Sequence, residues 1–148
     1  MSVYNRTASK ADPLVEAGAV YKDPIEIAKE VDVLVIMLGY PIDVEVMCLD
    51  SDKGILKHMK EGSYLIDHTS SSPGLATRVA EEGKKYGVGC LDAPVSGGDI
   101  GAQNGCLVTM VGGEEAHVDK MRPIIECYSQ SVKHMGAPGA GQHTKMAN

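Results

Sequence analysis

The strongest constraint on the fold is an apolar run, DVLVIML, at residues 32–38. The run is rich in Val and Ile and has no polar residue after Asp32. A strand with one face in water alternates polar and apolar residues, whereas a strand covered on both faces of a parallel sheet is apolar throughout. The run is also far shorter than the roughly 20 apolar residues that span a bilayer. We therefore expect a strand that is buried on both faces of a parallel sheet.

Other strand candidates alternate with helix signals along the chain. Asp23 with Pro24, and Ser72 with Pro73, each place a capping residue before a proline, which favours a helix start at both points. Strands are expected at residues 2–4, 32–38, 63–67, 88–93, 106–113 and 131–135. Helices are expected at residues 10–17, from 24, after 41, at 54–59, 73–86 and 114–127, and from 142. The alternation predicts an α/β fold with a doubly wound, mostly parallel sheet in one domain over residues 1–148.

Composition excludes some classes of partner. The chain has 148 residues, of which 43% are hydrophobic, and a net charge of −6. An acidic surface does not attract polyanions, so we expect neither nucleic acid nor an anionic membrane as a partner. We expect no cleavable targeting signal, and the four cysteines lack the spacing of metal ligands. We expect buried, reduced thiols, no metal site and a cytoplasmic location, with the mitochondrial matrix as the alternative.

Polar and glycine-rich turns follow the predicted strands, and in an open α/β sheet such turns surround the ligand. One of these turns contains Ser96, Gly97 and Gly98. A hydroxyl beside two glycines offers N–H groups that a carboxylate can reach without a side chain in the way. The alternative is a tight turn, for which two adjacent glycines suffice. These residues alone favour the two interpretations about equally.

Asn5, Arg6 and Thr7 follow the first predicted strand. In a dinucleotide-binding fold this position contacts the adenosine ribose, and an Arg with polar neighbours suits the 2′-phosphate of NADP better than the 2′-hydroxyl of NAD. The alternative is a solvated Arg in a polar turn, which is the more common role of a single Arg.

Lys145 is the candidate catalytic residue. It follows the glycine-rich loop GAPGAG and lies in the first turns of the last predicted helix, on one face with Gly141 and Asn148. A Lys in a water-poor cleft can exchange a proton with a substrate hydroxyl near neutral pH. The alternative is an exposed lysine without a catalytic role, which is the commoner case.

Two long motifs resemble the β-hydroxyacid dehydrogenase family, which includes 3-hydroxyisobutyrate dehydrogenase, tartronate semialdehyde reductase and the glyoxylate or succinic semialdehyde reductases. The segment DAPVSGGDIGAQNGCLVTMVGG is similar to the substrate-binding signature of that family, and GAPGAGQHTKMAN is similar to its catalytic signature. VYNRT, DVLVIML with GYP, and IDHTSSSP resemble its cofactor-contacting segments. The resemblance covers essentially the whole chain and implies a Rossmann-type NAD(P)-binding domain.

The resemblance also implies roles for individual residues. Ser96, Gly97 and Gly98 would bind the carboxylate of the substrate, which would be a short 3-hydroxy acid or semialdehyde acid. Lys145 would be the general acid or base, and Asn148 would help to orient the substrate. The residues that would line the cofactor, NADP with NAD as the alternative, are Asn5, Arg6, Thr7, Leu38, Gly39, Asp43 and Ser70.

Members of that family open with a strand and a GxGxxG turn for the cofactor pyrophosphate, and they continue beyond the catalytic Lys into a helical domain. We therefore expect a partial Rossmann domain that lacks the first βα unit and the C-terminal helical domain, and ends at the start of the interdomain helix. We expect little activity from the chain alone and a homo-oligomer for the full-length protein. Two alternatives are a 6-phosphogluconate dehydrogenase-like enzyme and a non-catalytic, dehydrogenase-like nucleotide-binding or scaffold module.

Overall fold

The computed structural model describes all 148 residues of the chain. The strands are β1 (Ser2–Val3), β2 (Val20–Tyr21), β3 (Val33–Ile36), β4 (Tyr64–Asp67), β5 (Gly89–Asp92), β6 (Val95–Ser96), β7 (Leu107–Gly112) and β8 (Ser129–Gly136). The α-helices are α1 (Asp12–Glu16), α2 (Pro24–Glu30), α3 (Pro41–Leu49), α4 (Pro73–Lys85), α5 (Gly98–Gln103), α6 (Glu115–Ile125) and α7 (Ala140–Ala147). Two short 3₁₀ helices are η1 (Ala8–Ala11) and η2 (Leu56–His58).

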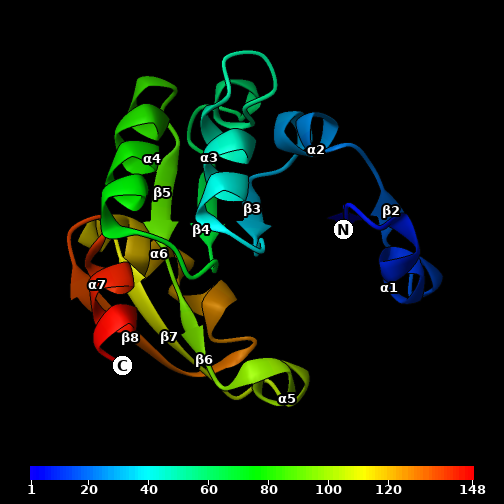
Figure 1. Cartoon of the computed structure of the whole chain (residues 1–148). Coiled ribbons are helices and arrows are strands. Elements are labelled where there is room, and N and C mark those ends of the chain that lie inside the picture. Colours follow the sequence, from blue (N-terminus) through cyan, green and yellow to red (C-terminus); the bar gives the residue numbers. More distant parts are fainter.

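Six of the strands form one mixed sheet in the order β3-β4-β5-β7-β6, with β8 paired to β7. β3, β4 and β5 are parallel to one another, and β8 is parallel to β7, whereas β5 and β6 are antiparallel to β7. β1 and β2 form a separate parallel pair. Figure 1 shows α3 and α4 on one side of the main sheet and α6 behind it. The α/β, mostly parallel Rossmann-type fold predicted from the sequence is confirmed.

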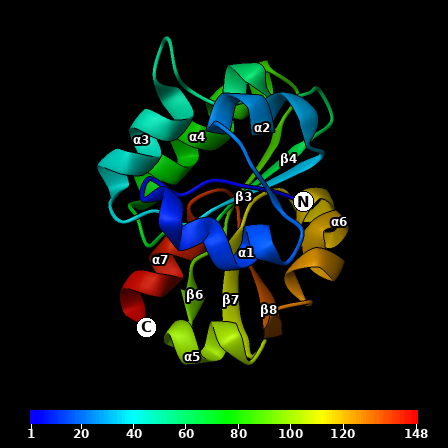
Figure 2. The same ribbon diagram turned by 90° about the vertical axis from the view of Figure 1, so that its right-hand side faces the viewer.

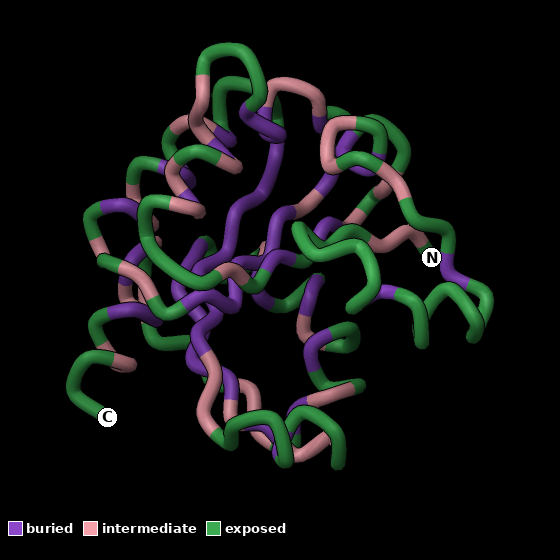
Figure 3. The backbone as a smooth tube through the Cα atoms, turned by 45° about the vertical axis from the view of Figure 1, so that its right-hand side comes forward, coloured by how far each residue is buried: buried purple, intermediate pink, exposed green.

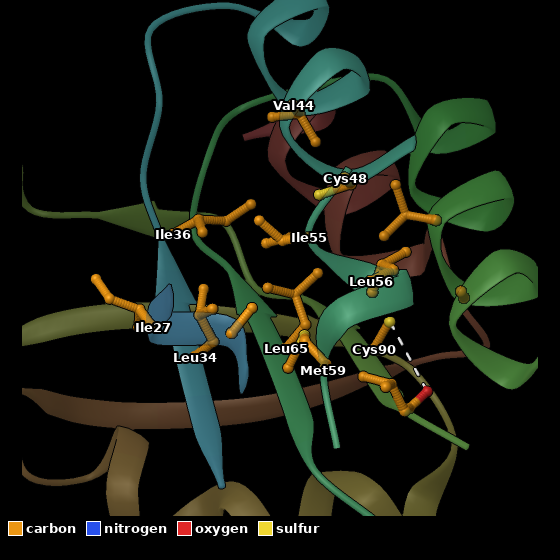
Figure 4. Packing of buried hydrophobic residues seen from close by; sticks show 14 of the residues in the cluster. Ile27, Leu34, Ile36, Val44, Cys48, Ile55, Leu56, Met59, Leu65 and Cys90 are labelled. Carbon is orange, nitrogen blue, oxygen red and sulfur yellow. Dashed lines mark hydrogen bonds between the residues drawn. The ribbon is translucent and has the colours of Figure 1, made fainter. Parts of the chain in front are cut away.

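Side chains of β4 and β5 alternate between two hydrophobic cores, one on each face of the sheet. Leu65 and Cys90 belong to the core formed with α2, α3, α4 and η2 (Figure 4). Ile66 and Leu91 belong to the core formed with α6 on the opposite face. Because a shift of one residue would exchange the two faces, this alternation fixes the register of both strands. Coverage of both faces confirms the doubly wound arrangement.

β3 differs from the prediction that its apolar run is buried on both faces. Leu34 and Ile36 are buried in the core with α2 and α3, but Val35 is 47% exposed and Met37 is 69% exposed. The reason is that β3 is the edge strand of the main sheet, and an apolar groove of about 450 Å³ separates it from β1. β1, α1 and β2 accordingly lie apart from the main sheet (Figures 1 and 3). The prediction of burial on both faces is wrong for this strand.

Helix starts follow the capping signals of the sequence. α2 begins at Pro24, and the Asp23 carboxylate accepts a hydrogen bond from the Ile25 N–H at 2.9 Å. α4 begins at Pro73, and the Ser72 hydroxyl accepts from the Leu75 N–H at 3.2 Å. A capping oxygen satisfies one of the N–H groups that have no partner inside a helix, which is why both helices begin where predicted.

Three short elements, β2, β6 and α5, have no counterpart in the sequence-based prediction. β2 and β6 have two residues each and are strands only because they pair with β1 and β7. α5 has the sequence GDIGAQ, and because glycines are poor helix formers its composition does not predict a helix. α7 begins at Ala140, two residues before its predicted start, directly after Gly139 with a φ of +94°.

The four cysteines are free thiols. Cys48 and Cys90 are buried, and burial raises the pKa of both thiols, so they are inert parts of the core. Cys106 is half-buried and Cys127 is exposed, so the prediction of buried thiols is wrong for these two. None of the helices has both the length and the apolar character needed to span a bilayer. No group of three or more His, Cys, Asp or Glu residues is arranged to hold a metal ion.

Candidate functional site

The predicted catalytic lysine lies against the predicted substrate-binding segment. Lys145, on α7, donates a hydrogen bond from Nζ to the backbone carbonyl oxygen of Val95 at 2.9 Å. Val95 directly precedes Ser96, so this contact joins two motifs that are 50 residues apart in the sequence. Figure 2 shows α7 beside β6. An ammonium group has three N–H donors, so a half-buried Lys145 keeps two of them for a ligand.

Residues 96–98 form the end of a strand and the start of a helix. Ser96 is the last residue of β6, and α5 begins at Gly98. Gly97 and Gly98 have φ values of +128° and +63°, which residues with a Cβ rarely adopt. A Cβ built on Gly98 would meet no atom within 4 Å, so open space borders this backbone. The glycines are therefore required by the turn, and the turn is also accessible to a ligand.

The N-terminus of α7 is packed directly against the ends of β5 and β7. The Asp92 carboxylate accepts hydrogen bonds from the N–H of Gly139 at 2.8 Å and from the N–H of Gln142 at 2.9 Å. A Cβ on Gly141 would lie 2.5 Å from the carbonyl oxygen of Met110, so only glycine fits there. This close approach explains the glycine-rich loop before the helix and fixes the position of its first turn.

Gln142 joins α7 to the loop after β4. Its side chain is 1% exposed; Nε2 donates to the carbonyl oxygen of Thr69 at 2.7 Å, and Oε1 accepts from the N–H of Ser71 at 2.8 Å. The Thr69 hydroxyl in turn accepts a hydrogen bond from the N–H of Leu38 at 2.9 Å. Consecutive hydrogen bonds therefore connect α7 with the residues that follow β4 and β3.

Two buried carboxyl groups lie side by side at the ends of β4 and β5. Asp67 and Asp92 are register partners and are 6% and 5% exposed. Burial raises the pKa of Asp67 to about 6; hydrogen bonds from Thr69 oppose this effect, and the charge of Asp92 adds to it. Burial also raises the pKa of Asp92, against the hydrogen bonds from Gly139 and Gln142. Asp67 therefore changes its charge close to neutral pH.

His68 has a structural role at the same sheet edge. Its Nδ1 lies 2.6 Å from the carbonyl oxygen of Ala93, and its Nε2 lies 2.8 Å from the hydroxyl oxygen of Tyr128. A carbonyl oxygen only accepts, so Nδ1 carries the proton and the tyrosine hydroxyl donates to Nε2. Burial lowers the pKa of His68, which keeps the ring neutral. With both nitrogens engaged, this ring ties the end of β4 to the connection between α6 and β8.

The cofactor residues predicted after β3 and β4 lie at the surface of the same edge. Leu38 is half-buried, whereas Gly39 and Ser70 are exposed. Ser70 lies between the two residues that Gln142 holds, so its backbone is fixed from both sides. The Asp43 carboxylate accepts a hydrogen bond from the N–H of Tyr40 at 3.0 Å and thereby caps α3. These hydrogen bonds therefore hold the predicted cofactor residues after β3 and β4 in place and leave them near the surface.

Asn5, Arg6 and Thr7 are exposed in the loop after β1. The Asn5 side chain accepts from the N–H of Thr7 at 2.9 Å, and the Asn5 carbonyl oxygen accepts from the Tyr21 hydroxyl at 2.9 Å. Arg6 takes part in no ion pair of the structure. Asn148 is exposed just beyond the end of α7. The hydrogen-bonded network around α7 therefore does not include Asn5, Arg6 or Thr7.

Sequence reasoning misses Asp92 and Gln142 as parts of the site. Both side chains are almost fully buried, and their partners are 47 to 73 residues away in the sequence. The one available signal is indirect: Asp92 ends an apolar strand, and Gln142 follows a glycine-rich loop, so each is a polar residue where burial is expected. A polar side chain that is buried needs partners, but the sequence does not name them.

The exposed edge has features that fit a dinucleotide. The hydroxyl oxygen of Ser71 is buried and has no hydrogen-bond partner. Arg6 has a free guanidinium group, which suits a phosphate. A Cβ on Gly39 would meet only the Asp43 carboxylate, at 3.5 Å, so a ligand can approach the backbone after β3. The Ser71 hydroxyl and the Arg6 guanidinium group therefore have no partner within the chain, and the backbone at Gly39 can be approached by a ligand.

The fold and the turns at this edge of the sheet are those of a dinucleotide-binding protein. Residues 1–136 match the family described as the NAD binding domain of 6-phosphogluconate dehydrogenase, and the chain belongs to this family. The chain spans about half the length of the curated relatives it matches. It is 48% identical over 147 residues to an uncharacterized oxidoreductase, YkwC, of Bacillus subtilis, covering 99% of this chain and 51% of that protein.

Other relatives carry more specific names. A probable 3-hydroxyisobutyrate dehydrogenase-like protein, mitochondrial, of Arabidopsis thaliana is 40% identical over 149 residues, covering 100% of this chain and 44% of that protein. The solved structure of 3-hydroxyisobutyrate dehydrogenase from Mycobacterium tuberculosis with L-serine has a TM-score of 0.89 and 31% identity, covering 97% of this chain and 48% of that one. The structure of Psf3 in complex with NADP+ and 2-OPP has a TM-score of 0.94 and 28% identity, covering 99% and 52%. The first two of these proteins are dehydrogenases by name, and the third is solved with NADP+.

Proposed function

We propose that the full-length protein is an NADP-preferring oxidoreductase that interconverts a short 3-hydroxy acid and the corresponding semialdehyde acid. The observation that carries this proposal is the hydrogen bond from Lys145 Nζ to the Val95 carbonyl oxygen at 2.9 Å, directly beside residues 96–98. This hydrogen bond supports the proposal because the Lys145 amine lies beside a backbone turn that a carboxylate can approach. The names of the relatives support the same class of reaction.

In this proposal the substrate carboxylate binds to the Ser96 hydroxyl and to the N–H groups of Gly97 and Gly98. Lys145, oriented by the Val95 carbonyl oxygen and in its neutral amine form, takes the proton from the substrate hydroxyl in the oxidation direction and becomes the ammonium. In the reduction direction it returns that proton to the carbonyl oxygen. Asn148 helps to orient the substrate. The bound nicotinamide cofactor supplies or accepts the hydride.

The cofactor is held in this proposal by the residues that follow β1, β3 and β4, namely Asn5, Arg6, Thr7, Leu38, Gly39, Asp43 and Ser70. The preference for NADP rests on Arg6, whose free guanidinium group suits a 2′-phosphate. The solved relative with NADP+ supports this preference, while the family description names NAD, so NAD is the alternative cofactor. A comparison of NADPH and NADH as substrates decides between the two.

The test replaces Lys145. The chain is joined to the parts of the Bacillus subtilis relative that it does not cover. Oxidation of the cofactor is then measured with glyoxylate, succinic semialdehyde, tartronate semialdehyde and methylmalonate semialdehyde. Lys145→Ala is expected to lower kcat by roughly 10²–10⁴, because it removes the proton-transfer group, while cofactor binding is kept. The control is Lys53→Ala, at an exposed lysine in the connection after α3. Retention of more than about a tenth of the activity by the first variant removes Lys145 from its role.

A second candidate function is a 6-phosphogluconate dehydrogenase-like reaction, since the matching family carries that name. Adding 6-phosphogluconate to the substrate set distinguishes it. A non-catalytic nucleotide-binding module would instead bind NADPH without turnover of any substrate. We expect little activity from the 148-residue chain alone, a homo-oligomer for the full-length protein, and a cytoplasmic or mitochondrial-matrix location.

A further inference from the structure

We propose that Gln142 is a positioning residue that couples the cofactor loop after β4 to the helix of the catalytic lysine. The proposal rests on the function proposed above, because that function gives Ser70 and Lys145 their roles. Gln142 lies three residues before Lys145 on α7, less than one helical turn away. Its side chain crosses to the residues on either side of Ser70.

The two contacts of the Gln142 side chain need both ends of a carboxamide. Nε2 donates to the Thr69 carbonyl oxygen at 2.7 Å, and Oε1 accepts from the Ser71 N–H at 2.8 Å. A carboxylate would supply only acceptors, and a methyl or thioether group would supply neither. At 1% exposure, water cannot replace a lost partner. The position therefore requires one donor and one acceptor on the same short side chain.

The same helix is fixed at two further points. The backbone N–H of Gln142 donates to the Asp92 carboxylate at 2.9 Å, which holds the first turn of α7 on β5. Lys145 Nζ donates a hydrogen bond to the Val95 carbonyl oxygen on β6 at 2.9 Å. The Thr69 hydroxyl accepts a hydrogen bond from the N–H of Leu38, after β3, at 2.9 Å. The Gln142 side chain is thus the hydrogen-bonding bridge between the loop that follows β4 and a helix seated on the other strands.

The proposed reaction requires a constant distance between the loop that follows β4 and helix α7. The hydride leaves or joins the carbon of the same carbon–oxygen bond whose oxygen exchanges a proton with Lys145. The loop with Ser70 positions one partner and α7 positions the other, so a shift between them misaligns both transfers at once. A misplacement of about 1 Å can cost roughly 10²-fold in rate. Loss of the bridge should therefore lower kcat more than it raises the KM for the cofactor.

The variant Gln142→Glu tests the bridge because it changes shape very little. Its carboxyl group can still accept from the Ser71 N–H, but in the ionised form it has no proton for the Thr69 carbonyl oxygen. Burial raises the pKa of the introduced carboxyl group, and its protonated form restores the missing donor. The defect should therefore be largest at about pH 8 and should shrink towards about pH 6.

Other groups around this side chain titrate or carry charge, and the comparison must allow for them. Asp92 lies on the backbone side, Asp67 and His68 precede Thr69, and Lys145 lies further along α7. Each measurement is therefore referred to the unmodified protein at the same pH. Gln130→Glu, at an exposed position on β8, is the matched control for the chemistry of the substitution.

The first readout needs no cofactor and uses the 148-residue chain. Hydrogen exchange of the Ser71 amide reports its bond to Gln142 directly. In Gln142→Glu we expect protection of this amide to fall at least about tenfold at about pH 8 and to recover to within about threefold at about pH 6. The control should match the unmodified chain at both pH values. If Gln142→Glu does not fold at the higher pH, Gln142→Met is used, and its loss of protection should be the same at both pH values.

The second readout is kinetic, on the chain joined to the remaining half of its Bacillus subtilis relative. We expect kcat of Gln142→Glu to fall roughly 10- to 100-fold at about pH 8, with the KM for the cofactor changed less than about threefold. Recovery of kcat towards about pH 6 is expected from the restored donor.

The outcomes separate the bridge from the proposed function. Unchanged protection of the Ser71 amide overturns the bridge, whatever the activity. Lost protection with unchanged kcat overturns the positioning role. If Lys145→Ala retains activity, the proposed function fails, and so does the coupling to Lys145, while the Ser71 measurement still decides whether Gln142 holds the loop.

Discussion

Replacing the buried carboxyl group of Asp67 with an amide should stabilise the protein at neutral pH and not at acidic pH. Asp67 is 6% exposed, and burial raises its pKa from 3.8 to about 6. A raised pKa means that the folded state holds the proton more tightly than the unfolded chain does. The stabilisation by this protonated group is therefore complete below about pH 3.8 and is lost as the pH rises through about 6.

The magnitude follows from the same values. A difference between 3.8 and about 6 corresponds to about 3 kcal/mol, since each tenfold change in proton affinity is worth about 1.4 kcal/mol. Asp67→Asn keeps an oxygen that can accept from the Thr69 N–H and carries no charge at any pH. The variant should therefore gain up to about 3 kcal/mol over the unmodified protein at about pH 8, and close to nothing at about pH 4.

Urea unfolding of both proteins across this pH range measures the difference in the free energy of unfolding. Thermal unfolding should show a rise in Tm of roughly 5–10 °C at the higher pH for a domain of this size. Asp119→Asn, at an exposed position on α6, is the matched control and should change stability by less than about 0.5 kcal/mol. The reasoning is refuted if Asp67→Asn is destabilising at about pH 8, or if its effect is the same at both pH values.

Two further changes test the packing around the site. Gly141→Ala should destabilise the fold by more than about 3 kcal/mol, because its Cβ would lie 2.5 Å from a carbonyl oxygen. The control Gly74→Ala, whose Cβ would meet no atom within 4 Å, should be neutral or stabilising by up to about 1 kcal/mol. Equal urea midpoints for the two variants would contradict the close approach at Gly141. Tyr128→Phe should cost about 1–3 kcal/mol, because it leaves buried His68 Nε2 without its donor at 2.8 Å. Tyr86→Phe, whose hydroxyl is 3.5 Å from a surface carboxylate, should change calorimetric stability little, and an equal loss in both variants would remove the His68 interaction as the cause.

The parts of the fold that the sequence predicts are those set by local chemistry. Cap-then-proline pairs at Asp23 and Ser72 satisfy helix N–H groups within three residues, so α2 and α4 start where predicted. The apolar strands β4 and β5 are predicted because their residues face two cores at once. β6 and the exposure of Val35 depend instead on which strand lies alongside, and no local pattern carries that information.

The candidate site likewise has parts that the sequence predicts and parts that depend on contacts between distant residues. The motifs around Ser96 and Lys145 were identified by resemblance, and the structure gives a contact between them through Val95. The role of Gln142 could not be predicted, because its partners are 71 and 73 residues away. The resemblance includes Gly141 in a motif, whereas the physical reason for a glycine there is the close packing of α7 on β5 and β7.

The open edge of β3 has a consequence for the behaviour of the protein in concentrated solution. β3 pairs with β4 only, so the other side of its backbone has no ladder partner. The exposed side chains there, Val35 and Met37, lie in a run without charge or proline between Asp32 and Gly39. Unpaired edges with such sequences are where chains add to one another and aggregate. We therefore expect molecules of this 148-residue chain to associate through the edge of β3 at high concentration, in spite of a net charge of −6 that opposes association.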